Sequence, residues 1–461
     1  MNAKHRIESD ALGRALISAD AYWGINTARA VENFPVSGRT VHPSLIAAYA
    51  RIKRAAATVN EREKTLDRRR AEAIRAACDE ILAGRLVDQF VVDKFQAGAG
   101  TSTNMNVNEV VCNRALEILR RRKGDYAYLH PNDHVNMSQS SNDTYPAALR
   151  LAALEGLRAF TPEALSLAAS FFRQGRRYAR LVKAGRTHLV DAVPVTLGGE
   201  FRAYGNALRA AVKSVKRAAG TLLELGIGGT GVGTGLNAPP GFARNMCREL
   251  SKLTGFRLKP SRDLQKAMQS QQAVGEVSAA LRGFAFEIGR IANDLRLLAS
   301  GPLTGIGEVR LPAVQAGSSF MPGKVNPSIL EMVNMVTFRV QGNDLTVAQA
   351  VGAGQLELNV MMPVAAEALL ESVELLTAAC RQMRTKCVDG LSADAKRCRE
   401  NARRTPAAAA VLVPKLGYAK VAALVRRAAE RGESVFDLAA REKLLSPQEL
   451  RMAEKALLPR N

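Results

Sequence analysis

Aromatic residues are scarce in this chain: they make up 5% of its 461 residues, and one of them is tryptophan. Proteins that bind single-stranded nucleic acid stack bases on aromatic side chains, so this scarcity argues against such a surface. Histidine is also rare, with five residues and no H-E-x-x-H motif, and the six cysteines include no C-x-x-C pair. These absences predict no zinc site, and the scattered cysteines are typical of a protein with reduced thiols.

Long apolar runs are missing as well. No stretch of about 18 uncharged apolar residues occurs, so the sequence predicts no membrane span. The first residues, MNAKHRIESDALGR, contain no apolar segment of the kind found in secretory signals. The overall composition, 47% apolar and 23% charged, is typical of a globular protein. We therefore expect a cytoplasmic protein with a large core.

The charge is strongly one-sided, since 65 Lys and Arg residues against 43 Asp and Glu residues give a net charge of +22. Such an excess is typical of proteins that bind nucleic acid. Here, however, the basic residues alternate with acidic ones along helical segments, and the densest run, residues 120–123, is short. We interpret the charge as solvated helix faces. A non-catalytic basic scaffold that binds nucleic acid with a steep salt dependence is the competing hypothesis.

The apolar residues follow helical spacing over most of the chain. The clearest segment has intervals of three and four residues, through Val274, Val277, Leu281, Phe284, Ile288, Ile291, Leu295 and Leu298. This heptad-like seam predicts a helix of about 35–40 Å that packs against other long helices. Because the seam is so long, we expect it to need partners beyond its own chain. Further helices are expected over residues 144–172, after the cap Asn142-Asp143, and over residues 195–224, 328–350 and 364–388.

These patterns predict a mainly α fold with three domains. Residues 1–142 mix helices with polar loops, residues 143–392 form a central long-helix bundle, and residues 393–461 form a small C-terminal helical domain. Near the end of the chain, Ser446 followed by Pro447 predicts a helix that begins with an N-cap and a proline in its first turn.

Four polar segments interrupt the helical pattern. They are rich in hydroxyl and amide groups and poor in carboxylates, and they cover residues 98–106, 138–143, 185–188 and 317–327. Each lies at or near an expected helix start, where free N–H groups and the helix dipole favour anions. Taken singly, Ser, Thr or Asn before a helix is usually only a cap. The four together indicate an anion-binding helical enzyme.

Two other motifs imitate known sites. The segment Gly226–Gly231 matches G-x-G-x-x-G, but the GTGLNAPPG-type sequence that follows does not open a helix, so we expect no dinucleotide site. His130 and His134 lie close together without a further ligand nearby. We interpret them as part of a loop or of a secondary anion site rather than as a metal centre.

These polar segments resemble the fumarase/aspartase superfamily. GSSFMPGKVNP (317–327) is similar to the signature loop of that superfamily, and AGTSTNMNVNEV, HPNDHVNMSQSSND, GRTHLVDAVPVTLG and GTGVGTGLNAPPGF match it in the same order. The resemblance implies a homotetramer in which the central helices form one twenty-helix core. It also implies active sites that are each shared by three subunits, and a small dicarboxylate substrate.

Several segments resemble aspartases more than class II fumarases. The middle residue of Thr101-Ser102-Thr103 is not the fumarase Gln, LPAVQAGSS lacks the acidic fumarase run, and GQLELNVM lacks the fumarase Tyr-Lys. Four residues depart from the aspartase pattern, namely Asn26, Ser141, Gly199 and Met362. The resemblance therefore implies elimination of ammonia from L-aspartate to give fumarate, with class II fumarate hydratase, favoured by Ser141 and Met137, as the alternative.

The family reaction is a reversible anti-elimination. A base removes the proton next to one carboxylate, which becomes a doubly charged aci-carboxylate and needs preorganised donors. The resemblance assigns hydroxyl side chains to this carboxylate: Thr101, Ser140, Ser141 and Ser319. It assigns the other carboxylate to Thr187, Lys324 and Asn326. It places Asn142 and His188 at the leaving amine.

The resemblance makes Ser318 the general base. A serine hydroxyl is a weak base, and Lys324 with the loop amides would lower its pKa. Glu331 is expected to pair with His188, although an ordinary exposed helix acid explains it nearly as well. The chemistry requires no cofactor and we assign no metal ligand; activation by a divalent cation stays open. The net charge would attract dicarboxylates over about 8–10 Å at cellular salt.

Overall fold

The computed structural model describes residues 5–457, and these are mainly helical, which confirms the predicted fold class. The α-helices are α1 (Ile25–Asn33), α2 (Pro43–Arg62), α3 (Arg68–Leu82), α4 (Thr101–Ile118), α5 (Ser141–Arg177), α6 (Leu197–Ala219), α7 (Phe242–Thr254), α8 (Leu264–Gln269), α9 (Gln272–Leu298), α10 (Ser328–Gly352), α11 (Met362–Met383), α12 (Ala395–Arg404), α13 (Val413–Leu416), α14 (Tyr418–Glu430), α15 (Val435–Arg441) and α16 (Pro447–Lys455).

The strands are short and pair two by two. They are β1 (His5–Asp10), β2 (Gly13–Ser18), β3 (Val182–Thr187), β4 (Val190–Thr196), β5 (Glu224–Leu225), β6 (Lys259–Pro260), β7 (Val309–Arg310) and β8 (Ser392–Ala393). The pairs β1–β2, β3–β4 and β7–β8 are antiparallel, and β5–β6 is parallel.

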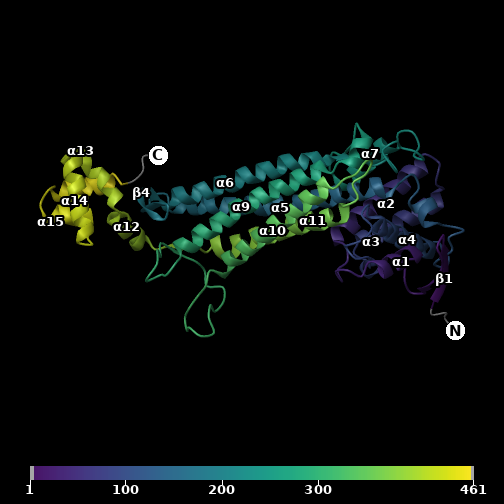
Figure 1. Ribbon diagram of the computed structural model, residues 1–461, viewed down its shortest axis with the longest axis horizontal. Coiled ribbons are helices and arrows are strands. Elements are labelled where there is room, and N and C mark those ends of the chain that lie inside the picture. The colour runs from purple at the N-terminus through teal and green to yellow at the C-terminus, as the bar shows by residue number, and fades with distance from the viewer. Residues whose placement is uncertain (1–4, 458–461) are drawn as a thin grey trace. The chain divides into compact units, whose positions relative to one another are not determined.

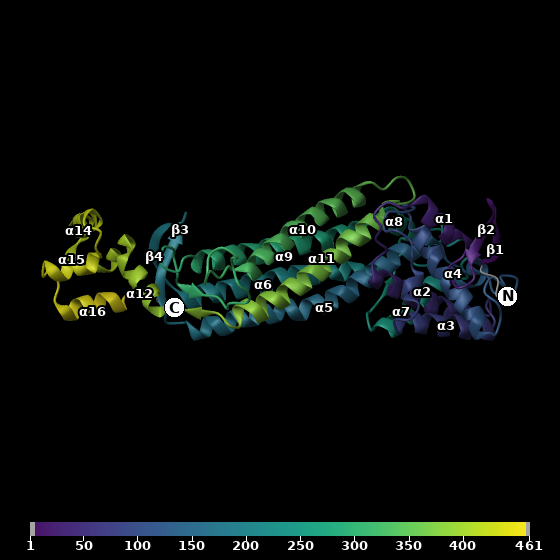
Figure 2. The same cartoon turned by 90° about the horizontal axis from the view of Figure 1, so that it is seen from below.

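The described residues form two compact units. The first contains residues 5–160, 214–283 and 339–375, and the second contains residues 161–213, 284–338 and 376–457. The five longest helices, α5, α6, α9, α10 and α11, contribute residues to both units, and in each unit these helices lie side by side (Figures 1 and 2). The three-domain division remains a prediction.

The apolar seam of α9 is buried throughout: each of its eight residues is at most 5% exposed. The expected helix is therefore confirmed, but our expectation that it needs partners beyond its own chain was wrong. The reason is the length of its neighbours, because α5, α6, α10 and α11 have 37, 23, 25 and 22 residues and can cover the 27 residues of α9. Large apolar side chains are exposed instead on α10, at Met335, Phe338 and Leu345.

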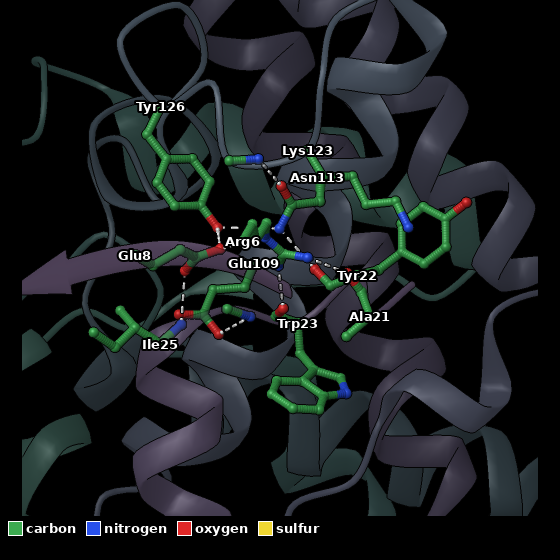
Figure 3. A network of polar contacts seen from close by, with 12 residues as sticks. Arg6, Glu8, Ala21, Tyr22, Trp23, Ile25, Glu109, Asn113, Lys123 and Tyr126 are labelled. Carbon is green, nitrogen blue, oxygen red and sulfur yellow. Dashed lines mark hydrogen bonds and ion pairs between the residues drawn. The ribbon is translucent and has the colours of Figure 1, made fainter. Parts of the chain in front are cut away.

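A network of polar contacts ties the N-terminal hairpin to α4 (Figure 3). The buried carboxylate of Glu109, on α4, accepts hydrogen bonds from the backbone N–H groups of Gly24 and Thr27 at 2.8 and 3.1 Å, so it satisfies the free N–H groups at the start of α1. Glu8 of β1 accepts from Tyr126 at 3.0 Å and from Arg6 at 2.8 Å. Burial raises the pKa of Glu109, and the hydrogen bonds that its carboxylate accepts from Thr27, Gly24 and Asn26 act in the opposite direction. The network fixes the helix whose first residue is Thr101.

The C-terminal helices of the second unit have an apolar cluster of their own, which includes Leu412, Leu424 and Phe436. The predicted start of the last helix is confirmed. The Ser446 hydroxyl accepts a hydrogen bond from the Glu449 backbone N–H, and the Glu449 carboxylate accepts one from the Ser446 backbone N–H. This reciprocal pair is a capping box, and it begins α16 at Pro447.

All six cysteines are buried and unpaired. Burial raises the pKa of Cys78 and of Cys247 to about 12. Thiols in such surroundings behave as small apolar side chains rather than as nucleophiles.

Candidate active site

The starts of α4 and α5 bring two predicted site hydroxyls together in the first unit. Thr101 is the first residue of α4, and its Oγ1 lies 3.0 Å from Oγ of Ser141, the first residue of α5. Gly100 has φ +73°, and a Cβ there would overlap the ring of Tyr145, so this turn requires glycine. Two helix N-termini with exposed or half-buried hydroxyls form an anion-binding arrangement.

The start of α5 is capped by Ser140, not by Asn142-Asp143 as the sequence suggested. The Ser140 hydroxyl accepts from the Asn142 backbone N–H at 3.2 Å, and the Asp143 carboxylate accepts from the Ser140 backbone N–H at 3.0 Å. Asn142 and Asp143 therefore lie in the first helical turn. The Asn142 side chain donates to the Gly231 carbonyl at 2.8 Å, which joins this turn to the glycine-rich segment.

Asp143 is the buried centre of this joint. Its carboxylate also accepts from the backbone N–H groups of Gly228 and Thr230, at 2.9 and 3.1 Å. Burial raises the pKa of Asp143 to about 6, and the three backbone donors act in the opposite direction. The sequence predicts only a capping role for this residue, because Gly228 and Thr230 are more than 80 residues away from it.

The glycine-rich segment lines a cavity of about 630 Å³ together with Ser140. No helix opens directly after Gly231, as predicted, so the dinucleotide motif is a look-alike. The Thr230 hydroxyl is buried, and within residues 5–457 it has no hydrogen-bond partner. A buried hydroxyl without a partner is a candidate for ligand contact. Thr230 has no signal in the sequence beyond the glycine-rich motif, and that motif is typical of nucleotide-binding loops.

Lys53 of α2 contacts the loop that precedes α5, and its side chain is fully buried. Its Nζ donates to Asn104 Oδ1 and Asn136 Oδ1 at 2.8 Å each, and to Gln139 Oε1 at 3.0 Å. Burial lowers the pKa of Lys53 to about 7. This side chain therefore ties α2 to α4 and to the loop before α5. The one signal in the sequence is its position on the apolar stripe of α2, four residues after Tyr49.

In the second unit, Thr187 and His188 lie at the tip of the β3–β4 hairpin. Thr187 pairs with Val190, so His188 and Leu189 form a two-residue turn, with φ values of 56° and 59°. Such turns usually contain Asn-Gly, and leucine rarely adopts this backbone conformation. Leu189 and Val190 are 75% and 66% exposed, and Thr187 and His188 are exposed as well.

A buried ion cluster supports the base of this hairpin. Glu308 is fully buried, and its carboxylate accepts from the Arg186 guanidinium at 2.9 and 3.0 Å and from the Asn401 amide at 3.0 Å. Lys183 Nζ lies 3.5 Å from Glu308 and 3.2 Å from Glu200. The cluster fixes the strand that leads to Thr187.

The signature loop is closed by its own backbone. The Gly317 N–H donates to the Lys324 carbonyl at 2.8 Å, and the Asn326 side chain donates to the Gly317 carbonyl at 2.6 Å. The Ser318 hydroxyl accepts from the backbone N–H groups of Phe320 and Met321, at 3.1 and 2.9 Å. Donors aimed at this oxygen favour its anionic form.

The remaining predicted residues of the second unit lie at or near this loop. Ser319 and Lys324 are exposed, and Glu331 is half-buried in the first turn of α10. No hydrogen bond or ion pair between Glu331 and His188 is found within the described part of the chain, so that pairing remains a prediction. Four predicted residues thus belong to the first unit: Thr101, Ser140, Ser141 and Asn142. Seven belong to the second: Thr187, His188, Ser318, Ser319, Lys324, Asn326 and Glu331.

Metal clusters and membrane-spanning helices are both absent from residues 5–457. These residues contain no group of three or more His, Cys, Asp or Glu side chains that could hold a metal ion. No helix among them has the length and apolar character needed to cross a membrane.

Known proteins resemble this chain over nearly its whole length. Aspartate ammonia-lyase of Bacillus subtilis (strain 168) is 44% identical over 447 residues, which cover 97% of this chain and 94% of that protein. Aspartate ammonia-lyase of Escherichia coli (strain K12) is 43% identical over 453 residues, which cover 98% and 95%.

Solved structures agree with these relatives. A Brucella melitensis structure described as fumarate lyase:delta crystallin bound to cobalt has a TM-score of 0.95 and 46% identity, and the match covers 98% of this chain and 99% of that one. Class II fumarase of Schistosoma mansoni has a TM-score of 0.93 and 34% identity, with 98% of each chain covered. A family profile described as "Lyase" matches residues 13–342. The chain therefore belongs to the fumarase/aspartase superfamily of lyases.

Proposed function

We propose that this chain acts as an aspartate ammonia-lyase, which eliminates ammonia from L-aspartate to give fumarate in a reversible reaction. The observation that carries the proposal is the name shared by the relatives described above, which align with at least 97% of the chain at 43–44% identity. Identity to the class II fumarase structure is lower, at 34%.

Ser141 is the departure from the aspartase pattern that bears on substrate. Serine keeps the hydroxyl group that a threonine would present, and this hydroxyl lies 3.0 Å from Thr101 Oγ1. The change therefore preserves the donor. Class II fumarase activity is the second candidate, favoured by Ser141 and Met137.

The carboxylate that becomes the aci-form binds to the hydroxyls at the starts of α4 and α5. Positive dipole ends of both helices favour an anion here, and in the assembly proposed below Ser319 completes the donor set from the signature loop of another subunit. Charge that develops in the transition state meets donors that are already oriented, and in many enzymes such preorganised donors account for most of the rate enhancement. Thr187, Lys324 and Asn326 hold the second carboxylate.

Ser318 removes the proton from the carbon next to the first carboxylate. The electron pair moves into that carboxylate, and its return forms the carbon–carbon double bond as the carbon–nitrogen bond breaks. Two backbone N–H groups at Ser318 Oγ and the cation of Lys324 in the same loop favour the alkoxide form. Asn142 of one subunit and His188 of another contact the amine, which leaves as ammonia, and Glu331 orients His188.

No cofactor is needed for this elimination, because each developing charge meets a donor of the protein itself. The Brucella relative binds cobalt. Activity measured with and without EDTA, and then with added Mg²⁺, tests whether a divalent cation activates this chain.

We further propose a homotetramer in which three subunits share each active site. Its support is the exposed apolar surface of α10 at Met335, Phe338 and Leu345, with exposures of 63%, 67% and 62%. Light scattering coupled to gel filtration measures this state. A cytoplasmic location is part of the proposal and agrees with the unpaired buried thiols.

The test of function is fumarate formation from L-aspartate and L-malate, offered in parallel and followed by ultraviolet absorbance. Turnover of aspartate alone is expected. Turnover of malate alone would establish the fumarase alternative. Ser318→Ala is expected to abolish turnover while the assembly survives, and Ser9→Ala, at an exposed serine of β1, serves as the matched control. Near-normal turnover in Ser318→Ala would refute the assignment of the base.

A further inference from the structure

A second polar cavity, of about 410 Å³, lies within the first unit. It is bordered by α5, the end of α6, the short helix α8 and the start of α9. Its charged lining residues are Arg150, Arg217, Glu224, Lys259, Lys266 and Glu276. None of them is among the predicted substrate-binding or catalytic residues.

Arg150 is the unusual member of this set because it is only 7% exposed. A guanidinium has five N–H donors. The hydrogen bonds found between residues 5 and 457 account for one of the two terminal nitrogens, which donates to the Glu224 carbonyl. The Nε atom is buried and has no hydrogen-bond partner in this part of the chain. The Glu224 carboxylate attracts Arg150 electrostatically but accepts no hydrogen bond from it among the described residues. Burial of a cation is costly when its N–H groups are left without acceptors.

The other charges of the cavity compensate for Arg150 only in part, because Glu224 is shared with other groups. Glu224 is engaged by Lys259, whose Nζ lies 3.6 Å from its carboxylate, and by the Ser261 hydroxyl at 2.8 Å. Arg217 and Lys266 are exposed and form no ion pair among the described residues. Four cationic side chains thus face two acidic ones, which leaves an excess of two positive charges.

The lining also indicates the chemical class of the ligand. No aromatic side chain borders the cavity, so nothing in it would stack a nucleobase. Hydroxyl groups of Thr221, Ser261 and Ser270 are present as neutral polar groups. Cations with hydroxyls and without aromatics are typical of sites for phosphate or carboxylate groups.

We propose that this cavity binds a doubly charged oxyanion, of the phosphate or dicarboxylate type, through Arg150, Arg217 and Lys266. The anion would accept hydrogen bonds from Arg150 and would neutralise the excess of two positive charges. The proposal does not depend on the reaction assigned above, because it rests on residues outside the predicted active site.

Calorimetric titration of the full-length protein tests the proposal, with inorganic phosphate and malonate as separate probes in a chloride-matched buffer. The variants are Lys266→Ala and Arg217→Ala, and the control is Arg248→Ala, which removes the same charge from an exposed position on α7. Arg150 is left unchanged because substitution of so buried a side chain would also disturb folding. Any binding of malonate at the active site is common to wild type and to all three variants. The difference in binding between wild type and each cavity variant therefore reports on the cavity.

We expect about one cavity-dependent anion per chain, bound about tenfold more weakly or worse in each cavity variant and within about twofold of wild type in the control. Cavity-dependent binding of phosphate alone identifies a phosphate site, and that of malonate alone identifies a dicarboxylate site. The proposal is overturned if neither anion binds, or if both bind equally well to wild type, Lys266→Ala and Arg217→Ala. A rise in thermal midpoint with the bound anion, lost in the same variants, is the second readout.

Discussion

Glu308 is the position where a single substitution tests the link between buried charge and the candidate active site. Its carboxylate is fully buried and receives the Arg186 fork, the Asn401 amide and the Lys183 ammonium. In Glu308→Gln the shape is kept but the negative charge is lost, and one acceptor oxygen becomes a donor. In either orientation that new donor faces a donor of Arg186, together with the Asn401 amide on one side or the Lys183 ammonium on the other.

The magnitude follows from burial. Removal of one partner of a buried ion pair leaves its counter-ion uncompensated and costs about 3–5 kcal/mol. The side chains of Arg186 and Lys183 are 17% and 3% exposed, so water reaches them poorly. Glu200, 3.2 Å from Lys183, compensates part of the loss. We therefore expect the lower end of the range, about 3 kcal/mol.

Hydrogen–deuterium exchange measures this effect where it arises. The free energy of opening of the β3–β4 hairpin should fall by about 3 kcal/mol in Glu308→Gln. Since Thr187 and His188 lie at the tip of that hairpin, kcat/KM for L-aspartate should fall by at least about tenfold, because small displacements of positioned groups are costly.

The matched control is Glu433→Gln. Glu433 also binds an arginine through two hydrogen bonds, from Arg441 at 2.7 and 2.9 Å, but the side chains are 21% and 54% exposed. Exposed pairs contribute about 0–1 kcal/mol, so the control should alter neither exchange nor turnover by much. If Glu308→Gln changes hairpin exchange no more than the control does, burial does not set the strength of this cluster and the reasoning fails.

Three further predictions concern other parts of the chain. The opening free energy of α2 should rise with pH between about 7 and 10, by at most about 1.4 kcal/mol per pH unit. The reason is that Lys53 keeps a proton in the unfolded state that it has lost in the folded state. Hydrogen exchange measured at pH 7, 8 and 9 should show this rise in wild type and not in Lys53→Met. Gly317→Ala places a Cβ 2.6 Å from the Lys324 carbonyl and should lower kcat about 100-fold. Gly220→Ala, which meets nothing within 4 Å and lies outside the predicted active site and α10, should keep full turnover in the same assay. Ser446→Ala should destabilise α16 by about 1 kcal/mol, seen as faster amide exchange in that helix with unchanged activity; slower or equal exchange would contradict the capping argument.

Sequence periodicity predicted which faces are buried, but not what covers them. The seam of α9 was identified residue by residue from its spacing, and every member is buried. Its covering partners were wrongly sought in other chains. Spacing along one helix carries no information about the length or position of its neighbours, so periodicity alone does not identify them.

The start of α5 shows the same limit at the scale of one turn. The sequence contains Ser140, Asn142 and Asp143, all of which are common capping residues. Local propensity did not distinguish among them, because the choice depends on the Asp143 contacts with Gly228 and Thr230. By contrast, the cap at Ser446 is purely local, and it was predicted correctly.

The sequence predicted the candidate substrate-contacting residues of the active site, but not the buried residues that support them. Family motifs identified the hydroxyls and amides that would touch substrate, and those roles remain predictions. Lys53 and Thr230 were missed, since a lysine in an amphipathic helix usually marks a solvated face and a glycine-rich loop was tested only as a nucleotide site. Both depend on contacts between distant segments, such as Lys53 with Asn104 and Asn136.

The burial of all six cysteines has a practical consequence for spectroscopy. With a pKa of about 12, a thiol such as that of Cys78 or Cys247 is ionised in only about one molecule in ten thousand at pH 8. A maleimide dye or spin label therefore reacts preferentially with a cysteine introduced at the surface. Labels at Leu189 on the hairpin tip and at Phe320 in the signature loop, both highly exposed, would report on the two segments without prior removal of native thiols.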